Sequence, residues 1–114
     1  MWGQLELKGD PSGKIRATAV LPLEQLEFVE QGGQDVGRVR VYLAIFTEDG
    51  HPIDLIRRDQ DLSFPSPRRA EALAEDLRYE LRFELPSRGH YVVTMTLRDE
   101  ISQEMGTALG EVRL

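Results

Sequence analysis

The amino-acid sequence predicts an all-β fold, a single antiparallel β-sandwich of about seven strands. Apolar and polar residues alternate along several segments, and clusters of Gly, Pro, Asp and Ser separate these segments. A chain of 114 residues has the usual length of one domain and can bury a core without disulfides, which the absence of cysteine excludes. We therefore expect residues 1–114 to form one β-sandwich domain.

The N-terminal part is predicted to be a hairpin followed by a long connection. Residues 5–7 alternate between apolar and polar, a turn cluster occupies 9–13, and the alternation resumes over 15–21. Segment 23–34 mixes apolar and acidic residues and ends in two glycines. We expect Phe28 to anchor this connection to the core.

The strand predicted at 36–47 is expected near the centre of a sheet, because both of its faces are apolar in the middle. Tyr42 and Phe46 share one of these faces, and core packing is the expected account of both. Asp49-Gly50 predicts a hairpin turn. The charged residues of the return strand at 53–62 mark it as a sheet edge.

Segment 63–76 is predicted to contain at most a short helical turn near 68–75. Pro65 and Pro67 exclude a central strand, and the apolar spacing that follows is helical. Arg68 and Arg69 oppose a longer helix, since they would lie at the positive end of its dipole.

The stretch from Leu77 to Leu97 shows the clearest alternation in the chain. Two long antiparallel strands, 77–85 and 91–97, are expected to form a hairpin with a short turn at 86–89. Leu81 and Phe83 would then face the core. A last strand is predicted at 107–114.

The charge balance disfavours two classes of partner. The chain has 14 basic and 20 acidic residues, a formal net charge of −6, so its field repels phosphate backbones and anionic lipid. No apolar run approaches the ~20 residues that span a bilayer. We expect no nucleic-acid partner and no membrane span; the expected partner is a protein or a neighbouring domain of the same chain.

Candidate catalytic and metal-binding groups are few. His51 lies in a turn near Asp49 and Asp54 and could join them around a metal ion, but a solvated turn explains the same residues. His90 should point away from the core, opposite to Tyr91. The loop serines lack the Gly-x-Ser-x-Gly elbow and a positioned histidine; they are Ser63, Ser66, Ser87 and Ser102. We predict no catalytic, cofactor-binding or metal-binding residue, with a hydrolase using His51 or His90 and nearby acids as the remote alternative.

Two ligand-binding alternatives stay open. Clustered carboxylates could coordinate calcium, although no Asp-x-Asp-x-Asp-Gly loop is present and solvated charge is the simpler account. These carboxylates are Asp59, Asp61, Asp99, Glu100 and Glu104. A flat row of exposed aromatic residues would instead indicate a glycan-binding surface. The candidates are Trp2, Phe28, Tyr42 and Phe64.

The segment Leu85-Pro86-Ser87-Arg88-Gly89-His90-Tyr91-Val92-Val93 resembles the tyrosine corner of immunoglobulin-like and fibronectin type III-like sandwiches. The resemblance implies that Gly89 opens the penultimate strand. It also implies that the Tyr91 ring packs in the core while its hydroxyl bonds to a nearby backbone group. The structural residues expected from pattern and resemblance together are Tyr91, Gly89, Phe28, Leu81 and Phe83.

A broader resemblance covers four segments: Pro22 to Phe28, Val39 to Gly50, Gly89 to Glu100, and Met105 to Ala108. Together they resemble the C-terminal β-sandwich of bacterial von Willebrand factor type A-related proteins of the Acidobacteria type. This implies a fragment of a longer, exported multidomain protein in which the sandwich has a structural or protein-interaction role. The Asp-x-Ser-x-Ser adhesion motif of the type A domain is absent, so metal-dependent adhesion is not implied.

Overall fold

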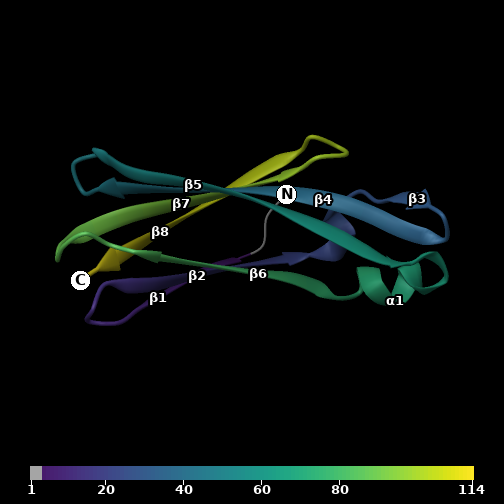
Figure 1. Ribbon diagram of the computed structural model, residues 1–114, viewed down its shortest axis with the longest axis horizontal. Helices are drawn as coiled ribbons and strands as arrows, with labels where there is room; N and C mark the ends of the chain where they lie inside the picture. Colours follow the sequence, from purple (N-terminus) through teal and green to yellow (C-terminus); the bar gives the residue numbers. More distant parts are fainter. Residues whose placement is uncertain (1–3) are drawn as a thin grey trace.

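The computed structural model describes residues 4–114 as two antiparallel sheets packed face to face, which confirms the predicted β-sandwich (Figure 1). The molecule is elongated, with extents of 49 × 24 × 18 Å. The three-stranded sheet has the order β1-β2-β6, with β1 at Gln4–Gly9, β2 at Lys14–Pro22 and β6 at Asp76–Glu84. The other sheet contains β3 (Val29–Gln31), β4 (Gln34–Thr47), β5 (Pro52–Pro65), β7 (His90–Asp99) and β8 (Met105–Arg113).

Strand β4 is the centre of the five-stranded sheet, as its two apolar faces predict. It pairs with β5 along almost its whole length on one edge, and with β3 and then β7 on the other. Strand β8 pairs with β7 and forms the opposite edge of this sheet. The predicted β1–β2 and β4–β5 hairpins both form, and the charged strand β5 lies at an edge.

The short connections follow the sequence closely, with one addition. The connection at 23–34 contains a 3-10 turn at Leu23–Gln25 and the exposed three-residue strand β3, which the polar sequence did not indicate. A 3-10 turn at Ser66–Arg68 and the helix α1 at Arg69–Leu73 join β5 to β6. The helix is therefore as short as expected.

The hairpin expected over residues 77–97 is wrong. Strand β6 pairs with β2 in the three-stranded sheet, whereas β7 pairs with β4 and β8 in the other. Alternation indicates that one face of each strand is buried, and two strands that face each other across a core share that pattern. The connection after Leu85, whose N–H donates to the Gly13 carbonyl at 2.9 Å, crosses from one sheet to the other.

The core lies between the sheets and is formed by alternate side chains of both. Ala17 of β2, Val41 and Leu43 of β4, and Val93 and Met95 of β7 are fully buried. Leu81 and Phe83 of β6 are buried in the same cluster, as expected.

Tyr91 and Gly89 form the turn that leads into β7. The Tyr91 side chain is buried, and its hydroxyl donates to the Ser87 carbonyl at 2.8 Å. Gly89 has a φ of +155°, a conformation that L side chains rarely adopt. Its N–H and carbonyl both pair with Leu114, which fixes this loop to the end of the chain. The hydroxyl-to-backbone bond is the one that a tyrosine corner requires.

Phe28 anchors the 23–34 connection to the core. It is buried, and its ring packs edge-on against Phe64 with a centroid distance of 4.9 Å and an interplanar angle of 61°. Gly37 of β4 also lies close to Phe28, and a Cβ atom at this position would lie 3.0 Å from the Phe28 ring. A glycine at this position of β4 therefore gives the aromatic ring its space.

The β1 and β8 edges approach closely because β8 presents small residues to the interior. Gly110 is opposite Leu7 of β1, and a Cβ atom there would lie 2.5 Å from Leu7 Cδ1. Gly110 therefore allows the first and last strands to come together.

Candidate functional site: the outer face of the five-stranded sheet

The outer face of the five-stranded sheet carries the largest exposed apolar side chains of strands β5 and β8. Leu55, Leu109 and Met105 are 67, 65 and 59% exposed. The register places all three on the side of the sheet that faces away from the core, since they align with outward-facing residues of β4 and β7. We call this side of β4, β5, β7 and β8 the outer face.

Cross-strand pairing arranges the outer face in rows. The central row, from β5 to β8, is Leu55, Ala44, Thr94 and Leu109. The next row toward the β4–β5 turn is Pro52, Phe46, Val92 and Glu111. On the other side lie Arg57, Tyr42, Thr96 and Thr107, with the two threonine hydroxyls 2.8 Å apart. The middle of the face is therefore aliphatic, aromatic and hydroxylic, and its charges lie at its margins.

Core packing, the expected account of Tyr42 and Phe46, is wrong for the single chain. Both lie on the outer face, half-buried among neighbouring side chains, while Val39, Val41 and Ile45 take the core side of β4. Strand β4 does have two apolar faces, as the sequence predicts, but the second sheet covers only one of them.

One end of the outer face holds a network of paired charges. Arg40 Nε lies 3.1 Å from Asp59 and 3.3 Å from Glu100, and Arg98 lies 3.7 Å from the same glutamate. The hydrogen bond to Asp59 is the main cause that raises the pKa of Arg40. Arg38 forms a further pair with Asp61 at 2.6 Å. Each arginine of the network thus already has a carboxylate partner within the chain.

His90 lies at the opposite end of the face, between two glutamates. Its Nδ1 is 3.3 Å from Glu48 of the β4–β5 turn and its Nε2 is 3.2 Å from Glu111 of β8. The side chain points outward, away from Tyr91 as predicted, although these contacts leave only 17% of it exposed. Both ring nitrogens therefore lie beside glutamate carboxylates, as in a surface ion-pair network.

The other histidine forms a local pair with an aspartate. His51 Nδ1 lies 2.8 Å from Asp49 Oδ2, and the second Asp49 oxygen accepts a hydrogen bond from the Thr47 hydroxyl. The hydrogen bond from Thr47 is the largest cause that lowers the pKa of Asp49, and the bond to His51 lowers it further. The hydroxyl therefore bonds the carboxylate rather than the imidazole, which is not the order of a nucleophile–base–acid triad.

The loop serines and carboxylates serve the fold. The expected loop position is wrong for Ser63, which lies in strand β5 opposite Val36. Among residues 4–114, none of the four candidate serines has a hydrogen bond to a histidine, and Ser66 and Ser87 bond to Asp35 and Tyr91 instead. Within the same range, no group of three or more His, Asp and Glu side chains is placed to hold a metal ion. The calcium candidates are divided between ion pairs on β5 and a hydrogen-bonded turn after β7.

Asp99 is the centre of that turn and is only 1% exposed. Its Oδ2 accepts the Glu27 N–H at 2.7 Å, and its Oδ1 accepts the N–H groups of Ile101 at 2.9 Å and Ser102 at 3.3 Å. The carboxylate therefore ties the β7–β8 loop to the 23–34 connection. The sequence does contain the signal for this role, because Asp99 continues the inward-facing series of β7 that ends in Leu97.

Asp35 is the second buried carboxylate, at 2% exposure, and it holds helix α1. It accepts hydrogen bonds from the Ser66 hydroxyl and from Arg69, both at 2.6 Å. The Ser66 bond and, to a lesser extent, Arg69 lower the pKa of Asp35, against the opposing effect of burial. The Arg69–Asp35 pair also explains why a helix starts at an arginine that its dipole disfavours.

The aromatic candidates do not form a continuous row. Phe28 and Phe64 pack against each other near the core, and Trp2 lies outside the described residues. Tyr42 and Phe46 share the outer face but are separated by Ala44. Four residues along a strand correspond to about 13 Å.

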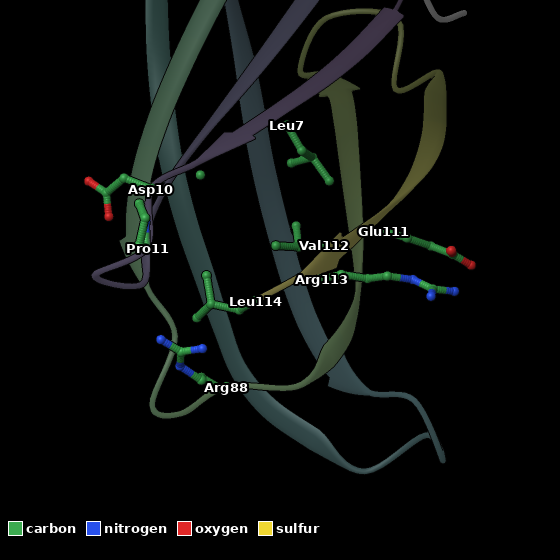
Figure 2. A pocket seen from close by; sticks show the side chains of 9 residues that line it. Leu7, Asp10, Pro11, Arg88, Glu111, Val112, Arg113 and Leu114 are labelled. Carbon is green, nitrogen blue, oxygen red and sulfur yellow. The ribbon is translucent and has the colours of Figure 1, made fainter.

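A cleft of about 450 Å³ lies at one end of the sandwich, between β1 and β8 (Figure 2). Leu7, Val112 and Leu114 point into it, while the carboxylates of Asp10 and Glu111 point away (Figure 2). Asp10 is engaged in its own turn, where it accepts the N–H groups of Ser12 and Lys14. The Arg88 guanidinium lies beside Leu114 (Figure 2), and one cation next to apolar side chains, with both carboxylates directed away, is not the arrangement of a catalytic site.

The comparisons with known proteins do not assign the chain to a family. No protein-family profile matches the sequence, and no curated protein matches it. In the part of the chain that the structure describes, no helix has the length and apolar character needed to cross a membrane.

Proposed function

We propose that the chain is a non-catalytic β-sandwich module with a structural or protein-interaction role in a larger bacterial protein. The observation that carries this proposal is the outer face, where Leu55, Leu109 and Met105 are more than half exposed on one side of one sheet. Single exposed apolar residues need no explanation, but several on one flat surface are typical of a protein contact. Paired charges at both ends and an uncharged middle give the surface the layout of an interface, with an apolar centre and a polar rim.

The immunoglobulin-like or fibronectin type III-like character of the module is part of the same proposal. It is supported by the Tyr91 hydroxyl bond to the Ser87 carbonyl at the start of β7. The sequence resemblance to the C-terminal sandwich of bacterial von Willebrand factor type A-related proteins supports an extracytoplasmic setting and a neighbouring domain in the same chain.

The first test measures the melting temperature of the purified chain with EDTA, with calcium, with zinc and with a panel of glycans. A module that only contacts proteins should show no shift, because a ligand that binds the folded state raises the melting temperature by mass action. A shift of several degrees with a metal ion or a glycan would refute the proposal.

A glycan-binding module is the second candidate, and the shared position of Tyr42 and Phe46 on the outer face favours it. Aromatic rings offer flat apolar surfaces to ligands, and both rings lie on the accessible side of β4. Under this alternative, a glycan would raise the melting temperature of the native chain and leave that of the Tyr42→Ala variant unchanged. The greater exposure of the aliphatic Leu55 and Leu109 favours the protein contact.

A further inference from the structure

We propose that the outer face binds a second copy of this chain, so that two five-stranded sheets stack face to face. This inference rests on the proposed function, because it names the partner of the same surface. It is argued from the size of the face, from the way its rows match each other under a two-fold axis, and from its charge.

The face is large enough for a dimer. Four strands about 4.8 Å apart, with about nine residues rising 3.4 Å each, cover a flat area of roughly 590 Å², which includes the charged rows at both ends as well as the three central rows. Two copies would bury about 1,200 Å² before the relief of the side chains is counted. This exceeds the roughly 1,000 Å² expected of a biological interface.

The rows of the outer face complement themselves. A two-fold axis parallel to the strands would place β5 of one copy over β8 of the other, and β4 over β7. Leu55 would then meet the partner's Leu109, and Ala44 would meet the partner's Thr94. The small residues in the middle of this row leave space for the leucines on either side, as in sheets that pack about 10 Å apart.

The adjacent row matches in the same way. Phe46 would lie over the partner's Val92. Tyr42, in the row on the other side of the central row, would lie over the partner's Thr96. The half-buried aromatic rings of β4 would therefore become fully covered by the dimer. The three central rows bring no two charged residues together; in the row beyond Tyr42, Arg40 would lie over the partner's Arg98, each beside its own Glu100.

The charge of the face also favours a second copy. The chain carries a net charge of −6, so two copies repel each other over most of their surface. On the outer face the arginines of the network are balanced by their carboxylates, with Arg40 between Asp59 and Glu100 and Arg98 beside Glu100. Repulsion between two copies is therefore weaker at this face.

Sedimentation equilibrium over a range of protein concentrations tests the inference. The native chain should approach twice its mass of 13.0 kDa, and Leu55→Asp or Leu109→Asp should raise the dissociation constant about tenfold or more. Both leucines are exposed, so the melting temperatures of the monomeric variants should stay close to that of the native chain at low concentration. Ile101→Asp is the matched control, since Ile101 is 40% exposed but lies in the β7–β8 loop. It should leave the mass unchanged.

Cysteine cross-linking tests the orientation, because the chain contains no cysteine of its own. A mixture of the Leu55→Cys and Leu109→Cys variants should be joined by a short bismaleimide cross-linker faster than either variant alone, because sheets about 10 Å apart hold the two Cα atoms beyond the ~7 Å that a disulfide bridges. Equal rates in the three samples would refute the two-fold axis proposed for the stacking.

Failure of the dimer can be told apart from failure of the proposed function. A mass of 13.0 kDa at every concentration, or a dimer that neither aspartate variant weakens, refutes the binding of a second copy to the outer face. A different protein could still occupy the outer face in either case. A melting temperature that rises with calcium or with a glycan overturns the proposed function itself.

Discussion

Replacing Asp99 by alanine should strongly destabilise the protein. The side chain lies at the end of β7 and is 1% exposed, and its two oxygens accept N–H groups from two separate segments. Removing the carboxylate leaves the Glu27 and Ile101 amides without their acceptors. It also disconnects the 23–34 connection from the β7–β8 loop.

The magnitude follows from the bonds that are lost. A hydrogen bond to a charged group contributes about 1.5–3 kcal/mol, and the bonds from Glu27 at 2.7 Å and Ile101 at 2.9 Å are both short. The longer Ser102 bond, at 3.3 Å, adds little. Asp99→Ala should therefore cost about 3–5 kcal/mol, a large share of the 5–15 kcal/mol that stabilises a typical domain.

Asp99→Asn separates the two bonds. One side-chain oxygen can still accept the Ile101 N–H, but the amide nitrogen then faces the Glu27 N–H, which is also a donor. This variant should lose about half as much stability as the alanine variant, roughly 1.5–3 kcal/mol.

Urea unfolding followed by far-UV circular dichroism measures these differences, and amide hydrogen exchange locates them. The Glu27 amide should exchange faster in both Asp99 variants. Asp61→Ala serves as the control, because within residues 4–114 Asp61 forms an ion pair with Arg38 on an exposed surface and its loss should change the unfolding free energy little. An Asp99→Ala variant within about 1 kcal/mol of the native chain, with unchanged Glu27 exchange, would refute this account of the turn.

Three further outcomes are expected. Tyr91→Phe should reduce the free energy of unfolding by about 1–2 kcal/mol, because the bond to the Ser87 carbonyl is lost; an unchanged urea midpoint would contradict the role given to the hydroxyl. Gly37→Val should reduce the free energy of unfolding by about 1–3 kcal/mol, because the valine side chain would collide with the Phe28 ring; a melting temperature equal to that of the native chain would contradict this contact. The lowered pKa of Asp35 means that its stabilisation is fully present above its unfolded pKa of about 3.9 and is lost as the pH falls through the lower folded value; Asp35→Asn should therefore flatten the acid limb of a stability-versus-pH curve, and identical acid limbs would contradict it.

The sequence predicts the strands well and their partners only where a turn specifies them. Asp49-Gly50 joins β4 to β5 as a hairpin because its turn geometry is local. The connection between Leu85 and His90 has a similar length, but it joins strands of different sheets. The inward-facing residues of β6 and β7 alternate identically in both arrangements, so the pattern could not distinguish a hairpin from a crossing.

The two buried aspartates could not be recognised from residue type alone. Acidic residues are usually solvated, and the sequence accordingly predicts that Asp99 and its acidic neighbours are exposed or bind calcium. Their positions are more informative than their charge, because Asp35 and Asp99 both occupy inward-facing positions at the ends of strands. A charged residue in phase with the core side of a strand therefore indicates a buried carboxylate with backbone or hydroxyl partners.

The same reasoning connects the failed expectation for Tyr42 and Phe46 with the proposed dimer. The sequence describes β4 as a strand with two apolar faces, and within one chain only the face of Val41 and Leu43 is covered. If two outer faces stack, Tyr42 and Phe46 become buried as the pattern predicts, and the assembly rather than the single chain is the state that the sequence encodes. If the chain is monomeric, the second apolar face must be accounted for by a different protein or a glycan. The sedimentation experiment thus decides both the partner of the outer face and the meaning of the β4 sequence pattern.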